Sequence, residues 1–344
     1  QAERVARGRF DLLGHRDLSF GDPIDWSLDP TTGIRAPDTH WSRIDHLDAG
    51  LVGDHKVIWE LNRQQYLSLL ARACHLTGDS RYSRLVVDHM DAWMRGNPPH
   101  TGINWSSSLE LAYRSISWLW TLWWLRQEDL DPDVIARALQ YLELHGRHVE
   151  VHLSTYYSPN THLTGEALGL LYLGTLLPFL PAAERWRTLG WDTLISEIDR
   201  HVEPDGTYFE RSTYYHRYTV DIYTHALLLG GNRPESELEI VRDALDRLLD
   251  HSSAITRPDG GTPLVGDDDG GHLWMPRYDR PTDFRAGLST GAVLLGRSDL
   301  AWAAGGLDPE TVWLLGPEAV QRWEDLDPEP PARITCSSES IRSR

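Results

Sequence analysis

The sequence predicts an all-α fold, and three observations support this. Apolar residues recur at helical spacing along most of the 344 residues, strand signals are scarce, and short turns of Gly, Pro and Asp join the helical segments in pairs. The pairs repeat roughly every 40–50 residues, which is typical of stacked or ring-closed helical hairpins. Because no repeat consensus is recognisable, we expect a toroid of paired antiparallel helices and not an open solenoid.

The first 58 residues differ from the rest of the chain. After a polar, helix-like stretch at Gln1–Arg9, they are rich in Gly and Asp and carry the scattered aromatic residues Trp26 and Trp41. We therefore expect residues 1–58 to form an extended N-terminal arm that packs on the helical body.

The helical body is expected over residues 59–323. Its first helix, at 60–77, is indicated by an apolar stripe made of Leu67, Leu70, Ala71 and Cys74. Gly78 stands where a C-terminal cap belongs, and Asp79 or Ser80 can cap the next helix. The same pattern predicts helices at 80–94, 107–126, 132–153, 162–177, 182–201, 213–229 and 235–253, with shorter ones at 283–295 and 309–314.

From Glu324 the chain becomes polar and Pro-rich. Residues 324–344 are expected to be a linker or the truncated start of a further domain.

The charge balance excludes some classes of protein. With 33 Lys and Arg against 51 Asp and Glu, the formal charge is −18, so we expect neither a nucleic-acid partner nor a membrane-surface partner. No apolar run reaches the roughly 20 residues that a membrane span needs. The two cysteines do not decide the redox compartment, and nothing in the sequence decides the oligomeric state.

Four segments place polar and aromatic side chains near helix starts, where free backbone N–H groups attract anions. In a helical toroid, such loops gather at one rim of the central cavity. Ordinary helix capping by Asn160, Ser106 and Thr213 is the alternative interpretation of each segment taken singly. The segments are Trp59–Gln65, Gly102–Glu110, Ser158–Glu166 and Asp205–Tyr218.

In this order and spacing, the segments resemble the helical N-terminal domain of the heparinase II/III-like polysaccharide lyases. The resemblance runs from about Phe10 to Trp323, and as a set the motifs are fairly specific. They are Asn-Arg at Asn62, Gly-Ile-Asn-Trp at Gly102–Trp105, Ser-Pro-Asn-Thr-His at Ser158–His162 and Tyr-His-Arg-Tyr at Tyr215–Tyr218.

The resemblance implies an incomplete (α/α) toroid that full-length members join to a C-terminal antiparallel β-sandwich. It also implies cleavage by β-elimination of a uronic-acid-containing polysaccharide, which can be heparan sulfate-, alginate- or exopolysaccharide-like. We expect no metal ion or other cofactor. In that reaction a base removes the proton alpha to the uronate carboxylate, the 4-O glycosidic bond breaks, and an unsaturated sugar results. A periplasmic or secreted location is favoured by the same resemblance, although no signal segment is readable.

The residue types suit this chemistry. The proton becomes acidic enough when hydrogen bonds or cations neutralise the carboxylate, and Asn160 and His162 can do so, with Arg63 as a weaker candidate. A tyrosine can act as base and then protonate the leaving oxygen if its pKa falls from about 10 toward the working pH. We expect His216 and Arg217 to lower that pKa as neighbouring positive charges.

Three tyrosines compete for the role of base. The motif points to Tyr215, while Tyr214 and Tyr218 lie close by. On one helix Tyr214 and Tyr218 share a face and Tyr215 is turned by about 100°, so only one of the two faces can point at substrate. The expected substrate-binding residues are Asn62, Arg63, Gln64, Asn104, Trp105, Glu210, Arg217 and Tyr218, with Trp105 placed against a sugar ring.

Two departures from the family pattern bear on activity. Gln64 stands where members often carry a His after the Asn-Arg pair, and an amide cannot shuttle protons. The C-terminal β-sandwich is missing, since only Ala332–Arg344 follow Pro331. We therefore expect a fragment or truncated product that requires its β-sandwich as a partner, and we leave open whether it is active alone.

Other motifs favour structural roles. His145, His148 and His152 span too much of a helix for one zinc ion, and we expect a solvated helix face there. Gly266–Gly271 carries three Asp residues, but it lacks the full calcium-loop spacing and is expected to be a tight turn.

Two further functions stay open. One is an inverting glycoside hydrolase on a similar toroid, which needs two carboxylates about 6.5–9.5 Å apart. The other is a carbohydrate-binding fragment that has lost catalysis. The carboxylates available to a hydrolase are Glu60, Glu110, Glu166, Glu210 and Asp267.

Overall fold

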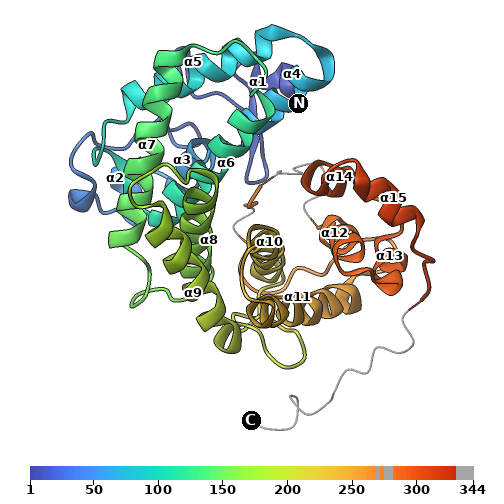
Figure 1. The fold of residues 1–344 in the computed structure, drawn as a ribbon. Helices are drawn as coiled ribbons and strands as arrows, with labels where there is room; N and C mark the ends of the chain where they lie inside the picture. Colours follow the sequence, from blue (N-terminus) through green and yellow to red (C-terminus); the bar gives the residue numbers. More distant parts are fainter. Residues whose placement is uncertain (269–271, 275–281, 331–344) are drawn as a thin grey trace. The chain divides into compact units, whose positions relative to one another are not determined.

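The computed structural model describes residues 1–268, 272–274 and 282–330. These residues form two compact units. Unit 1 comprises residues 1–192 with 272–274, and unit 2 comprises residues 193–268 with 282–330. The described part of the chain is predominantly helical, which confirms the predicted all-α class (Figure 1).

The N-terminal part of unit 1 contains short elements, not one continuous extended segment. It has two small antiparallel hairpins and three short helices before the first longer helix. These elements are α1 (Ala2–Val5), β1 (Phe10–Leu12), β2 (His15–Leu18), β3 (Leu28–Asp29), β4 (Ile34–Arg35), the 3-10 helix η1 (Trp41–Arg43) and α2 (Ala49–Val52).

The rest of unit 1 is built mainly from longer helices, and its most extensive contacts join helices that are two apart in the sequence. Figure 1 shows α6, α7 and α8 side by side, in agreement with their contacts. The elements are α3 (His55–Asn62), α4 (Gln65–Thr77), α5 (Ser80–Gly96), the 3-10 helix η2 (Ile103–Trp105), α6 (Ser108–Trp124), α7 (Pro132–Val151), α8 (Thr161–Leu176) and the first half of α9 (Ala183–His201).

The predicted helix at 60–77 is wrong as a single element. Gln64 adopts a left-handed conformation, with φ 54° and ψ 29°, and so separates α3 from α4. The Gln64 side-chain oxygen accepts a hydrogen bond of 2.6 Å from the buried Trp118 indole. This hydrogen bond with a residue of a distant helix stabilises the break between α3 and α4. Because its two partners are far apart in the sequence, the spacing of apolar residues could not predict the break.

Two glycines set the close approach of α6 and α8. A Cβ added at Gly165 would lie 2.5 Å from a Leu109 methyl carbon, and one added at Gly169 would lie 2.5 Å from the Ala112 Cβ. Only glycine fits at such separations, because a methyl group would force the helices apart. The packing therefore holds the start of α8, where Asn160 and His162 lie, against α6.

Unit 2 consists of the end of α9 and six further helices. The helix α12 contacts α10, α11, α13, α14 and α15 and so lies at the centre of this packing. Short helices at 298–304 and 318–324 were not expected from the sequence. The elements are α10 (Thr213–Leu229), α11 (Glu235–Ile255), α12 (Arg285–Leu295), α13 (Ser298–Ala304), α14 (Pro309–Leu315) and α15 (Glu318–Glu324).

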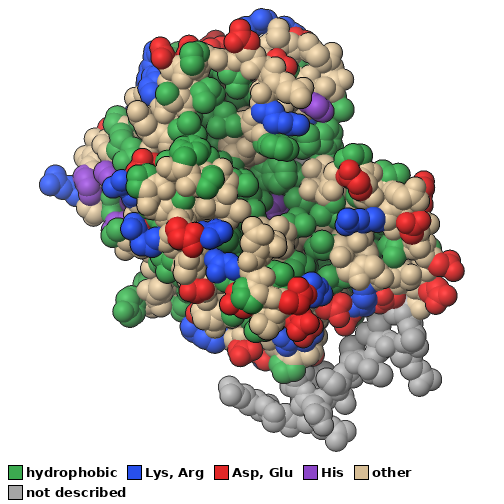
Figure 2. Space-filling model, in the orientation of Figure 1, with side chains coloured by type: hydrophobic (Ala, Val, Ile, Leu, Met, Phe, Trp, Pro, Cys, Tyr) green, Lys and Arg blue, Asp and Glu red, His purple; other side chains and the backbone are tan. Residues whose placement is uncertain are grey.

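The surface of unit 2 carries part of the negative charge. On the face seen in Figure 2, acidic side chains gather over α13 and α15. Glu318 and Glu324, both on α15, are exposed. Across the residues that the structure describes, no helix is both long and apolar enough to span a bilayer.

Candidate active site

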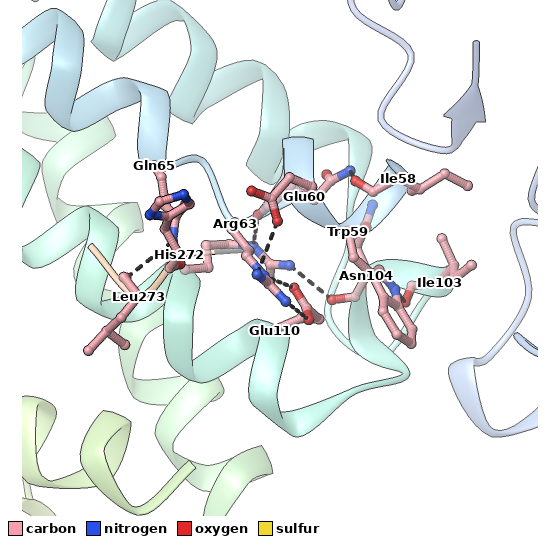
Figure 3. A network of polar contacts seen from close by, with 12 residues as sticks. Ile58, Trp59, Glu60, Arg63, Gln65, Ile103, Asn104, Glu110, His272 and Leu273 are labelled. Carbon is pink, nitrogen blue, oxygen red and sulfur yellow. Dashed lines mark hydrogen bonds and ion pairs between the residues drawn. The ribbon is translucent and has the colours of Figure 1, made fainter. Parts of the chain in front are cut away.

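The first polar segment forms a buried ion-pair network. Arg63 donates from Nε and Nη2 to both oxygens of Glu110, at 2.7 and 2.8 Å, and from Nη1 to Glu60 at 3.0 Å (Figure 3). All three side chains are buried, and the guanidinium also lies 5.1 Å from the centre of the Tyr113 ring. Two carboxylates already neutralise Arg63, so its predicted role in gripping a substrate carboxylate is replaced by a structural one.

The side chains of Asn62 and Asn104 hydrogen-bond to other parts of unit 1. Both side-chain amides donate 2.9 Å hydrogen bonds to the carbonyl of Trp26 in the N-terminal part, and Asn62 also accepts 2.7 Å from the Trp93 indole. Both are fully buried. These amides satisfy backbone and side-chain partners inside unit 1, so the expected contact with substrate is not available to them in this structure.

Arg114 joins the same two segments. Its guanidinium donates to the carbonyls of Asn62 at 2.6 Å and Asn104 at 3.2 Å, and it lies 4.2 Å from the centre of the Trp93 ring. Burial lowers the pKa of Arg114 to about 9, with the Glu110 carboxylate opposing the shift. The sequence places Arg114 beside the second segment and gives no sign of this linking role.

Trp105 and Gln64 are also fully buried. The Trp105 ring packs against the rings of His100 and His145, each at a centroid distance of 5.3 Å. Sugar stacking requires an exposed ring face, so Trp105 occupies a core position instead of the expected one. Gln64 is held by its hydrogen bond from Trp118, as described above.

The predicted solvated helix face at His145, His148 and His152 is wrong for the first two residues. Both are buried among aromatic rings, and only His152 of the three is exposed. Burial lowers the pKa of His148 to about 3, with further contributions from neighbouring histidines and Arg114, and burial lowers the pKa of His145 as well. In the described residues, no group of three or more His, Cys, Asp or Glu is placed to hold a metal ion.

The start of α8 presents Asn160 and His162. Asn160 caps the helix, and its side-chain oxygen accepts a 3.0 Å hydrogen bond from the backbone N–H of His162. Both side chains are half-buried. The capping role that was the alternative interpretation of Asn160 is therefore present, and it fixes the direction in which the first turn of α8 faces.

A buried carboxylate lies one turn further along α8. Glu166 accepts hydrogen bonds from the backbone N–H and the hydroxyl of Ser154, both at 2.7 Å. Burial raises the pKa of Glu166 to about 7, against the lowering effect of the Ser154 hydrogen bonds. The contact fixes the loop between α7 and α8 at its start.

Tyr215 lies in the first turn of α10, in unit 2. Ser212 caps this helix, because its hydroxyl oxygen accepts 3.2 Å from the Tyr215 backbone N–H and donates 2.6 Å to the Asp267 carbonyl. Thr213, the residue considered as cap from the sequence, donates its backbone N–H to the Val265 carbonyl at 2.9 Å instead. These bonds fix the orientation of the first turn.

The tyrosines divide as the helical spacing predicts. Tyr214 and Tyr218 are buried, with ring centroids 6.3 Å apart, and Tyr214 meets the Phe284 ring edge-on at 5.7 Å. Tyr215 is half-exposed. The guanidinium of Arg217 lies over the Tyr214 ring at 5.6 Å. Tyr214 and Tyr218 therefore face the interior of unit 2, and Tyr215 does not share their face.

The two expected cations beside the tyrosines behave differently. Burial lowers the pKa of His216 to about 3, so this imidazole is neutral near pH 7 and its predicted role as a positive charge is wrong. Although burial opposes it, the Asp221 carboxylate raises the pKa of Arg217, which forms a 3.2 Å ion pair with that carboxylate. Arg217 thus stays charged but is neutralised by its partner.

A cavity of about 680 Å³ lies against the start of α10, within unit 2. His216 lines it and donates from Nε2 to the Leu248 carbonyl at 3.0 Å. Among the described residues, its Nδ1 has no hydrogen-bond partner. Sequence reasoning missed His251, which lies on α11; its ring centroid is 4.9 Å from that of His216.

Two further expectations concern the segments around this cavity. Glu210, in the segment before α10, is half-exposed and accepts a 3.0 Å hydrogen bond from the Tyr208 hydroxyl. The predicted turn at Gly266–Gly271 lies outside the described residues from 269 onward.

Comparison with known proteins identifies the family. A family model described as "Heparinase II/III N-terminus" matches residues 8–275, which include all four polar segments. The chain belongs to the heparinase II/III family.

Two curated relatives of this heparinase-family chain are both described as heparin-sulfate lyases. A heparin-sulfate lyase from Pedobacter heparinus is 28% identical over 273 residues, covering 74% of this chain and 36% of the relative. A heparin-sulfate lyase from Bacteroides stercoris is 23% identical over 274 residues, covering 73% of this chain and 37% of the relative. The chain therefore spans little more than a third of the length of these relatives.

Solved structures show the same fold. The crystal structure of heparan sulfate lyase HepC from Pedobacter heparinus matches 88% of this chain and 44% of its own, with a TM-score of 0.61 and 21% identity. A crystal structure of heparinase III matches 88% of this chain and 45% of its own, with a TM-score of 0.64 and 18% identity. This likeness supports the predicted helical-toroid fold and, at such identities, shows nothing beyond the fold.

Proposed function

We propose that this chain is the helical domain of a polysaccharide lyase that cleaves a uronic-acid-containing polysaccharide by β-elimination. The family match over the four polar segments carries the proposal. The named relatives, both heparin-sulfate lyases, favour a heparan sulfate-like substrate over an alginate-like or exopolysaccharide-like one.

In this proposal Tyr215 is the base. Its half-exposed side chain stands at a helix start that Ser212 holds in place, whereas Tyr214 and Tyr218 are packed inside unit 2. The Tyr215 phenolate takes the proton alpha to the uronate carboxylate. The electron pair left on that carbon forms the new double bond as the 4-O glycosidic bond breaks, and the phenol proton passes to the leaving oxygen.

Asn160 and His162 complete the proposed chemistry by neutralising the uronate carboxylate. Hydrogen bonds to this carboxylate stabilise the negative charge that develops as the proton leaves. Both residues lie in the first turn of α8, where backbone N–H groups and the helix dipole also favour an anion. Glu210, which is half-exposed in the segment before α10, stays a candidate for a substrate contact. The expected contacts of Arg217 and Tyr218 are replaced by the ion pair with Asp221 and by burial inside unit 2.

The two alternatives gain no specific support. Four of the five carboxylates considered for a hydrolase serve internal contacts. Glu60 and Glu110 pair with Arg63, Glu166 accepts from Ser154, and Glu210 accepts from Tyr208. A carbohydrate-binding fragment without turnover would bind the polymer and yield no unsaturated product.

The test uses the ultraviolet absorbance of the conjugated product. This chain, and a longer version that carries a β-sandwich domain, are incubated with heparan sulfate, alginate and hyaluronan. We expect absorbance to rise with one polymer, to be lost in Tyr215→Phe and to persist in Tyr214→Phe, the matched control one residue away. Hydrolysis without absorbance would support the hydrolase instead, and an active Tyr215→Phe variant would remove Tyr215 as the base.

A further inference from the structure

The loop between α7 and α8 exposes two adjacent tyrosines. The side chains of Tyr156 and Tyr157 are 100% and 92% exposed, more than any other large hydrophobic side chain among the described residues. Isolated exposed apolar residues are common, but two neighbouring aromatic rings with both faces open to solvent are not. At these exposures, neither ring contributes to the packing of the described residues of unit 1.

The loop is fixed at both ends. At its start, Ser154 gives its backbone N–H and its hydroxyl to the buried Glu166 carboxylate, each at 2.7 Å. At its end, the Asn160 backbone N–H donates 2.8 Å to the Ser158 carbonyl, and the Asn160 side chain caps α8. The tyrosines therefore project from a short anchored loop, and its anchors belong to the helix that carries Asn160 and His162.

Tyrosine is well suited to bind sugar at such a position. Its ring offers an apolar face to the C–H surface of a pyranose, its hydroxyl can donate to a carboxylate or sulfate, and only two side-chain torsions are ordered on binding. A polysaccharide extends well beyond the single uronate that reacts, so residues near the proposed carboxylate-binding turn can hold neighbouring sugars.

We propose that Tyr156 and Tyr157 form a stacking platform for sugar rings of the same acidic polysaccharide, outside the reacting unit. This inference rests on the proposed function and adds a substrate-binding element that none of the four polar motifs contains. The platform holds the polysaccharide while Asn160 and His162 bind the carboxylate of the reacting uronate.

Direct binding measurements test the platform. Titration calorimetry with heparan sulfate, alginate and hyaluronan compares the unaltered chain with Tyr156→Ala/Tyr157→Ala. We expect the Kd for the bound polymer to rise about tenfold in the double variant. Tyr156→Phe/Tyr157→Phe should keep most of the affinity, since the rings remain. Phe179→Ala is the matched control, because Phe179 is 65% exposed on unit 1 but lies at the other end of α8.

The outcomes separate this inference from the proposed function. Equal affinity in the unaltered and doubly substituted chains overturns the platform and leaves the lyase proposal standing. Tyrosine-dependent binding, with no unsaturated product from this chain or from its longer version, supports the platform and overturns the lyase proposal. Absence of binding to any of the three polymers overturns the platform directly. Circular dichroism of each variant confirms that the helices are retained.

Discussion

Arg63 and Glu110 form a two-pronged ion pair inside unit 1, with both donor–acceptor distances below 2.9 Å. Glu60 provides a second carboxylate to the same guanidinium. The pair connects the end of α3 to the first turn of α6 and so joins the first two of the four polar segments.

Replacing Arg63 should act on stability. Arg63→Ala would leave Glu60 and Glu110 buried without their counter-charge, and we expect the free energy of unfolding to fall by roughly 3–5 kcal/mol. Urea unfolding followed by circular dichroism measures this loss. Arg147→Ala is the control, because Arg147 pairs with Glu143 on the surface and should cost less than about 1 kcal/mol. Equal stability of the two variants would contradict the structural role of Arg63.

Acid should destabilise unit 1 through its buried histidines. The folded-state pKa of His148 is lowered to about 3 by burial, whereas an unfolded histidine titrates near 6.5. Between these values the unfolded chain binds the extra proton, so the stabilising contribution is complete above about pH 6.5 and is lost as the pH falls toward 3.

His148→Gln should flatten that part of the stability curve, by at most about 1.4 kcal/mol per pH unit. Thermal unfolding between pH 4 and pH 8 gives the slope. His15→Gln serves as the comparison, since His15 is exposed on β2. If the pH dependence of stability were the same in His148→Gln as in the parent, the pKa of His148 would not be lowered by folding.

Glu166 should show the opposite sign of pH dependence. Burial raises its folded-state pKa to about 7, above the usual value near 4.5. The folded chain therefore holds a proton between pH 4.5 and 7 that the unfolded chain has released, and stability from this group falls as the pH rises through that window. Glu166→Gln cannot ionise, so its stability relative to the parent should improve from pH 5 to pH 8. A constant difference would place the pKa of Glu166 near its ordinary value.

Ser212 should matter for the position of Tyr215. Ser212→Ala removes the hydroxyl that accepts from the Tyr215 N–H and donates to Asp267, at an expected cost of about 1 kcal/mol in unfolding free energy. If Tyr215 is the base, kcat for elimination should fall while KM changes little. Ser212→Thr keeps the hydroxyl and should restore kcat. Loss of stability with unchanged kcat would assign Ser212 to capping alone.

Helix positions followed closely from local pattern, and side-chain roles did not. The apolar stripe of α4 and a cap at Asp79 or Ser80 predicted their elements, since helical spacing and capping are properties of neighbouring residues, and the structure has Asp79 as the cap. The same local view suggested substrate contacts for Asn62 and Asn104. Their partner is the carbonyl of Trp26, which lies 36 and 78 residues away, so no local signal could reveal it.

The tyrosine helix shows the same division. Spacing alone placed Tyr215 on a different face from Tyr214 and Tyr218, because a helix turns by about 100° per residue. Which face is buried depended on Phe284, from a distant part of unit 2. The neutrality of His216 likewise follows from its burial against α11, which removes water from the imidazole and disfavours its charged form.

The amino-acid order therefore determines the all-α class, most helix bounds and the family motifs, because each depends on residues within a few turns. The folded chain alone decides that Arg63 is neutralised by Glu110, that Trp105 is core, and that Tyr156 and Tyr157 stay in solvent. Burial and charge pairing are set by groups that meet only after folding, and they decide whether a polar or aromatic side chain supports the fold or is available to a ligand.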